Sequence, residues 1–248
     1  MSQLLIGHPS ELVMLYSRIL AGLLEKRILR QISVLDMLRC DSRNNGDCGL
    51  IAMAHISNMD ELGSPAHDFS LPNTNPRFGG ETVSMGAMND RNLLLVAFIC
   101  NHCPYVIHIR DSFVEFASNY QRRGLDLVAI CSNDVLTHPG DSPERMAEEA
   151  LKFGYSFPYL FDETQSTAKV YRAACTPDFF LYDQNRKLAY RGQYDSSRPG
   201  NNEPVTGKDL SAAVDCLLEG LPASIEQRPS VGCNIKWKSG EEPDYFNV

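Results

Sequence analysis

The chain has 248 residues, of which 43% are hydrophobic, and its formal net charge is −8. This is enough apolar material for one domain with a buried core and an appendage. The acidic balance disfavours nucleic acid as a partner, and eight cysteines are too few for a secreted fold held together by disulfides. We therefore expect a cytoplasmic protein.

The first 60 residues are predicted to form a helical extension and a linker. Leu12, Tyr16, Ile19 and Leu23 recur at helical spacing, whereas Arg18 interrupts the apolar run, so no integral membrane span is expected. No positive residue precedes the first apolar residues, which argues against a cleavable signal peptide. The extension is interpreted as a packing appendage or an arm for a homodimer, with a membrane-surface or targeting role as the alternative.

Residues 93–106 predict a buried strand that leads into a helix. Seven apolar residues run from Leu93 to Ile99, and Pro104 suits the first position of a helix. Cys103 is then the helix cap, where unpaired N–H groups favour its thiolate and lower its pKa below about 8.5. Cys103 is therefore expected to react before the other cysteines.

From Leu93 onward, the segments of the chain alternate between strand and helix patterns. This alternation, with a hairpin near its end, predicts an α/β fold with a central mixed sheet and helices on both faces. The expected elements are strand 93–99, helix 104–122, strand 125–131, helix 143–153, strand 157–161, helix 163–172, strands 178–182 and 188–194, and helix 206–218.

Four segments, 63–71, 93–106, 174–183 and 231–238, resemble the thioredoxin-like superfamily. The resemblance is to its redoxin branch of peroxiredoxins and alkyl hydroperoxide reductases, also called thiol-specific antioxidant proteins, and to a peroxiredoxin-like subgroup. It implies a thioredoxin-like redoxin domain over residues 61–222, preceded by the extension 1–60. Residues 223–248 form a tail that carries Cys233. The resemblance implies cysteine redox chemistry, without a cofactor or a bound metal.

The sequence Cys100-Asn-His-Cys103 matches the C-x-x-C pattern of thioredoxins. In thioredoxins the nucleophile follows the strand phenylalanine by five residues, and five residues after Phe98 is Cys103. We therefore favour Cys103 as the nucleophile over Cys100. The resolving thiol is left open between Cys100, Cys175 and Cys233.

The residues that activate peroxide in peroxiredoxins are absent from the matching positions. Cys100 stands where those enzymes have threonine, Val96 where they have proline, and Pro177 where they have arginine. Thr176-Pro177 instead resembles the cis-proline of thioredoxins, where the residue before the proline pairs with a substrate's extended chain. The site is thus predicted to be closer to thioredoxin than to a peroxidase.

Two further side chains are candidates for substrate binding, with Thr176 and Pro177. His102 either lowers the pKa of its neighbour Cys103 or is an ordinary loop histidine. Arg198 either binds acidic groups of a substrate or is a solvated loop arginine.

Three classes of function remain open. The preferred one is a thiol-dependent oxidoreductase that acts on a protein or small-molecule disulfide or peroxide and is reduced by an external dithiol. An alternative within this class is peroxidase activity with a non-standard peroxiredoxin site. The second class is a Cu or Zn protein that uses Cys100, His102, Cys103 and Cys175. The third is a catalytically silent binding scaffold.

Overall fold

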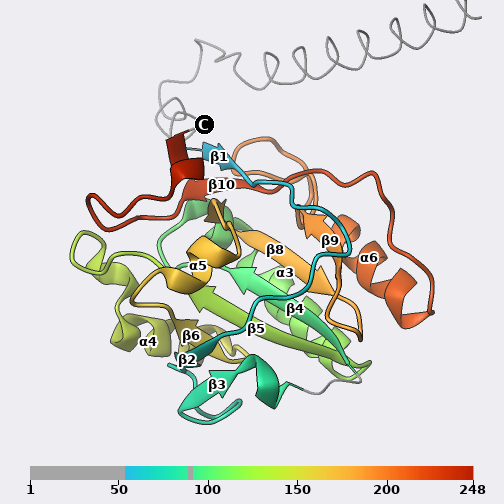
Figure 1. Ribbon diagram of the computed structural model, residues 1–248, viewed down its shortest axis with the longest axis horizontal. Helices are drawn as coiled ribbons and strands as arrows, with labels where there is room; N and C mark the ends of the chain where they lie inside the picture. The colour runs from blue at the N-terminus through green and yellow to red at the C-terminus, as the bar shows by residue number, and fades with distance from the viewer. Residues whose placement is uncertain (1–53, 89–91, 248) are drawn as a thin grey trace, which may run out of the picture. The chain divides into compact units, whose positions relative to one another are not determined.

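The computed structural model describes residues 54–88 and 92–247 (Figure 1). The predicted amphipathic helices of the N-terminal extension lie outside these residues. The described elements, in chain order, are β1 (Ala54–Ile56), β2 (Ser70–Pro72), β3 (Thr82–Ser84), β4 (Leu93–Phe98), α3 (Pro104–Gln121), β5 (Leu125–Cys131), α4 (Pro143–Phe153), β6 (Tyr159–Phe161), α5 (Ser166–Val170), β7 (Cys175–Thr176), β8 (Asp178–Tyr182), β9 (Leu188–Gly192), α6 (Lys208–Leu218) and β10 (Val231–Asn234), with short 3-10 helices at 85–87, 139–141 and 244–247.

Five strands form the central sheet in the order β6-β5-β4-β8-β9 (Figure 1). β4 pairs in parallel with β5, and β5 with β6, whereas β8 is antiparallel to both β4 and β9. All six residues of β4 are buried, as its continuous apolar run predicts for a central strand. The mixed sheet expected from the sequence is confirmed.

The two faces of the sheet carry separate hydrophobic clusters. Because side chains alternate along a strand, Leu95 and Ala97 face one way while Val96 and Phe98 face the other. The first face is covered by α3 and α6, and the second by α5 with the β2–β3 hairpin. Helices therefore lie on both faces, as predicted. In the described part of the chain, no helix has both the length and the apolar character needed to cross a membrane.

A second, three-stranded sheet in the order β1-β10-β7 was not predicted. β1 lies within the first 60 residues, which were predicted to form a helical extension and a linker, and β10 lies in the tail. Strands of two to four residues carry too little periodicity to be recognised, because their stability comes from pairing with distant segments. The division of the chain at residues 60 and 222 otherwise stays a prediction.

Several predicted elements are longer than those observed, and two of them lie on either side of Asp162. The helix expected at 163–172 is a single turn, Ser166–Val170, and the strand expected at 157–161 begins only at Tyr159. Asp162 explains where α5 starts: its buried carboxylate accepts hydrogen bonds from the backbone N–H groups of Thr167 and Ala168. Both elements nevertheless lie where the sequence placed them.

Candidate active site

Cys103 lies at the start of α3, where the strand–helix pattern placed it. It is the N-cap residue, Pro104 follows it, and its carbonyl oxygen accepts the first helical hydrogen bond from Ile107 at 2.9 Å. Its thiol does not cap the helix and instead points at Thr176. Cys103 is completely buried, which was not predicted from the sequence. The local sequence gave no sign of this, because the covering strand β10 comes from the tail.

The hydrogen bonds around Cys103 favour its thiolate. Burial alone raises the pKa of Cys103, but hydrogen bonds from Cys100, Cys233 and Thr176 outweigh that effect and lower the pKa well below its ordinary value. A contact of 3.0 Å from its sulfur to the Thr176 carbonyl oxygen acts in the opposite direction, since only a protonated thiol donates there. The donors to the Cys103 sulfur outnumber this single acceptor, so the pKa of Cys103 is lowered and its thiolate is favoured.

The two neighbouring buried cysteines stay protonated. Burial raises the pKa of Cys100 well above its usual range, and the hydrogen bond to Cys103 adds to this. The Cys100 sulfur also lies 3.5 Å from the Thr176 hydroxyl oxygen. Burial likewise raises the pKa of Cys175, whose thiol donates to the Pro177 carbonyl oxygen at 3.7 Å. Cys100 therefore shares the surroundings of Cys103, whereas the thiol of Cys175 points to a different partner.

The Thr176-Pro177 peptide bond is cis, as the resemblance to thioredoxins implied. Thr176 is almost fully buried, and both its carbonyl oxygen and its hydroxyl face the cysteines. Its backbone pairs with β10, so that Cys233 lies directly opposite Thr176. The structure thus brings together Cys100, Cys103, Thr176 and Cys233 from three separate parts of the chain.

His102 is held by an aspartate that was not predicted from the sequence. Its Nδ1 lies 2.6 Å from Oδ2 of Asp141, and its ring stacks on His138 at a centroid distance of 5.1 Å. Asp141 is fully buried and also accepts hydrogen bonds from the Asn101 backbone and the Asn133 side chain, both at 2.8 Å. The hydrogen bond to Asp141 raises the pKa of His102. No local pattern links Asp141 to the C-x-x-C segment, because the contact forms only when the 3-10 helix at 139–141 packs beside that segment.

Arg198 holds its own loop together. Its guanidinium donates to the carbonyl oxygens of Asp195 and Ser197, at 2.7 and 2.6 Å, and to the Gln193 side chain at 2.6 Å. Burial lowers the pKa of Arg198, although the Asp195 carboxylate opposes this. These contacts support a structural role for Arg198, and substrate binding by this residue stays a prediction.

A metal site here would use two of the ligands proposed from the sequence, Cys100 and His102, together with Asp141. The ligand atoms of Cys100, His102 and Asp141 lie within 4.8 Å of one another. Two of these atoms already form the His102–Asp141 ion pair, and the third is a thiol that burial keeps protonated. Metal binding would therefore have to displace a proton and separate the pair.

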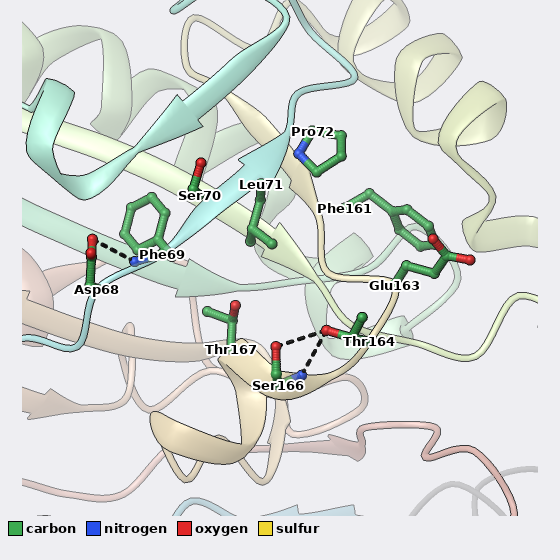
Figure 2. Close-up of a pocket in the computed structure, with 10 residues that line it drawn as sticks. All are labelled: Asp68, Phe69, Ser70, Leu71, Pro72, Phe161, Glu163, Thr164, Ser166 and Thr167. Atoms are coloured by element: carbon green, nitrogen blue, oxygen red, sulfur yellow. Dashed lines mark hydrogen bonds between the residues drawn. The ribbon is translucent and has the colours of Figure 1, made fainter.

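A cavity of about 510 Å³ lies elsewhere, between β2 and the start of α5 (Figure 2). Figure 2 shows its lining, which includes Asp68, Leu71, Phe161 and Thr164 but no cysteine. This cavity is therefore not the opening to Cys103.

The fold and the cysteine cluster define a thioredoxin-like protein of the redoxin type. The sequence matches the AhpC/TSA family over residues 62–191, more than half of the chain, and the chain belongs to that family. The resemblance noted in the sequence is thus confirmed.

Two solved structures are similar to most of the chain. A hypothetical protein from Sinorhizobium meliloti is 50% identical with a TM-score of 0.71, and the match covers 75% of this chain and 99% of that one. An uncharacterized conserved protein from Geobacillus kaustophilus is 48% identical with a TM-score of 0.72, covering 75% and 97%. The comparison with curated proteins gave no match. Membership of the family supports thiol-dependent redox chemistry in general.

Proposed function

We propose that this chain is a thiol–disulfide oxidoreductase in which Cys103 is the nucleophile and Cys100 the resolving thiol. The observation that carries the proposal is the contrast between the two cysteines. Hydrogen bonds favour the thiolate of Cys103, while burial keeps Cys100 protonated beside it. A thiolate is the reactive form in disulfide exchange, and a neighbouring thiol is what completes the reaction.

The reaction takes two electrons from the two cysteines. The Cys103 thiolate attacks one sulfur of a disulfide, and the other sulfur leaves as a thiolate and takes up a proton. Cys100 then loses its proton and attacks the Cys103 sulfur, which forms the Cys100–Cys103 disulfide and releases the second half of the substrate as a thiol. An external dithiol returns the two electrons and is itself oxidised to a disulfide.

Mapping of disulfides by mass spectrometry tests this assignment. The full chain is treated with one equivalent of oxidised glutathione and then alkylated in acid. We expect a Cys100–Cys103 disulfide in the parent. A Cys103–glutathione adduct should be trapped in the double variant Cys100→Ser/Cys233→Ser, because Cys233 also contacts Cys103. Neither product should form in Cys103→Ser. Cys131→Ser is the matched control, because Cys131 is also buried but burial raises its pKa. A parent in which Cys103 stays reduced would contradict the proposal and favour the scaffold.

Peroxidase activity is the second candidate, since the AhpC/TSA family match supports it. Reduction of peroxide would form a sulfenic acid on Cys103, and Cys100 would displace water from it to give the same disulfide. We expect slow turnover, because Cys103 is buried and Cys100 and Pro177 stand where peroxiredoxins have threonine and arginine. Stopped-flow measurement should give a rate constant far below the diffusional ceiling of about 10⁸–10⁹ M⁻¹s⁻¹. A rate near that ceiling would make peroxide the preferred substrate.

A further inference from the structure

The tail strand β10 occupies the position that the cis-proline edge offers to an extended substrate. β10 runs antiparallel to β7, with Cys233 opposite Thr176 and Asn234 opposite Cys175. The backbone beside the cis-proline is therefore already paired with the protein's own chain. Cys233 of that chain lies opposite Thr176 and in contact with Cys103.

Gly232 allows β10 to approach this closely. A Cβ atom built on Gly232 would lie 1.9 Å from the Thr176 carbonyl oxygen and 3.1 Å from the Pro177 nitrogen. Both are backbone atoms and cannot move aside as the end of a side chain can. Any other residue at this position would push β10 away from the cysteines.

The outer edge and the end of β10 are also fixed. Its other edge pairs with β1, which places Ala54 opposite Cys233, and the Ser57 N–H donates to the Ser230 carbonyl oxygen at 2.9 Å. Beyond β10, Ile235 and Trp237 are buried in the cluster on the second face of the sheet. An extended polypeptide therefore cannot pair with Thr176 while β10 is in place.

Exposure separates Cys233 from the cysteines beneath it. Cys100, Cys103 and Cys175 are 2%, 0% and 0% exposed, whereas Cys233 is only half-buried. Cys233 also hydrogen-bonds to Cys103, through its thiol and its backbone N–H. Among the cysteines at the site, Cys233 is thus the one that touches both Cys103 and solvent.

We propose that Cys233 is a relay thiol that carries electrons from an external dithiol to the buried Cys100–Cys103 disulfide. This inference rests on the proposed function, because it needs that disulfide to form. The hydrogen bond to Cys103 and burial raise the pKa of Cys233, so Cys233 gives up its proton to solvent as it attacks the Cys103 sulfur. The bond to Cys100 breaks, and Cys100 leaves and takes up a proton. The external dithiol then attacks the Cys233 sulfur and releases the Cys103 thiolate. Its second thiol attacks the mixed disulfide, so that Cys233 is reduced again and the dithiol is oxidised.

Reduction kinetics test the relay. The full chain is oxidised with oxidised glutathione, freed of reagent and reduced with dithiothreitol, while free thiols are counted over time. We expect Cys233→Ser to form the Cys100–Cys103 disulfide but to be reduced at least about tenfold more slowly than the parent. Cys216→Ser, which removes a half-buried cysteine of α6, is the matched control and should behave as the parent.

The outcomes separate the two proposals. Equal reduction rates for Cys233→Ser and the parent would overturn the relay and leave the Cys100–Cys103 chemistry intact. Failure of Cys103 to oxidise in the parent would instead overturn the proposed function.

A second variant tests the covering strand. Gly232→Val should displace β10 and raise the rate at which iodoacetamide alkylates Cys103. Gly86→Val is the control, because nothing lies within 4 Å of a Cβ at Gly86. An unchanged alkylation rate in a folded Gly232→Val protein would show that β10 does not shield Cys103 and would contradict the relay.

Discussion

At the scale of single residues, Cys103 combines two properties that oppose each other. The hydrogen bonds to its sulfur favour the charged form, while complete burial removes it from solvent and from reagents. A stabilised thiolate is also a weaker intrinsic nucleophile. Cys103 is therefore expected to react slowly with disulfides in bulk solvent and faster with the cysteines that already contact it.

Alkylation of Cys103 is predicted to be slow and nearly independent of pH. Because hydrogen bonds lower the pKa of Cys103 well below its ordinary value, we expect the thiolate to predominate from about pH 5 to pH 9. An ordinary thiol reacts about tenfold faster for each pH unit in the range below its pKa. Peptide-level iodoacetamide rates, with free cysteine as the reference, check this. A rate for Cys103 that rises in step with free cysteine would refute the low pKa.

The His102–Asp141 pair makes a second prediction at this scale. Asp141→Asn should lower the pKa of His102, since the hydrogen bond to Asp141 is the largest cause of its rise. A histidine whose pKa is raised in the folded state stabilises the fold at pH values below its unfolded pKa of about 6.5. This stabilisation is lost as the pH rises through the folded-state pKa. The variant should therefore lose more stability near about pH 6 than near pH 9.

Titration of the His102 ring protons by NMR measures this directly. His138→Gln is the control, because it removes the stacked ring but keeps the ion pair, so His102 should still titrate above its ordinary value. The same pKa for His102 in Asp141→Asn and the parent would show that Asp141 is not the cause.

At the scale of elements, the start of α6 depends on a glycine. Gly207 is its N-cap with a φ of 62°, and a Cβ there would lie 2.5 Å from the Tyr194 ring. That ring packs against three phenylalanines of the core and has little room to move. The position therefore requires glycine for its backbone conformation and for its lack of a side chain.

Gly207→Ala is predicted to destabilise the fold more than Gly220→Ala. Gly220 also has a positive φ, of 74°, but nothing lies within 4 Å of its Cβ position. Gly220→Ala should cost about 1–2 kcal/mol for the backbone alone, and Gly207→Ala about 1–3 kcal/mol more for overpacking. Urea unfolding of both variants measures the difference. Equal losses would mean that Tyr194 moves aside without cost.

At the scale of the whole molecule, Arg191 joins the segment after β1 to the central sheet. Its guanidinium is fully buried, forms ion pairs with Asp60 and with Asp178 (3.4 Å), and donates to the Arg172 carbonyl oxygen at 2.9 Å. Asp178 directly follows the cis-proline. This charge cluster thus connects the N-terminal part of the described chain with the strand that supports the active site.

Arg191→Leu is predicted to lower the free energy of unfolding by about 3–5 kcal/mol at neutral pH, because it leaves the buried Asp178 without its counter-charge. Burial already raises the pKa of Asp178, and Arg191 opposes that rise. Without Arg191 the pKa of Asp178 rises further. A carboxyl group whose folded pKa is raised destabilises the fold at pH values above its unfolded pKa of about 3.9, and this destabilisation becomes smaller as the pH falls. The loss relative to the parent should therefore shrink from about pH 7 to pH 5.

Denaturant unfolding at several pH values checks this. Adding Asp178→Asn to Arg191→Leu should recover part of the loss, since the neutral amide removes the uncompensated charge. A loss that is independent of pH, with no recovery in the double variant, would mean that Arg191 acts through packing alone.

The sequence by itself determined the central strand β4, Cys103 at the start of α3 and the alternation that makes the α/β fold. These features depend on residues close together in the chain, where apolar runs, proline and glycine act locally. Only the tertiary structure decided that Asp141 holds His102, that Cys233 lies opposite Thr176 and that Cys103 is fully buried. These contacts join segments far apart in the chain, and the register of such pairing is fixed by close packing, here by the approach that Gly232 allows, which no local pattern records.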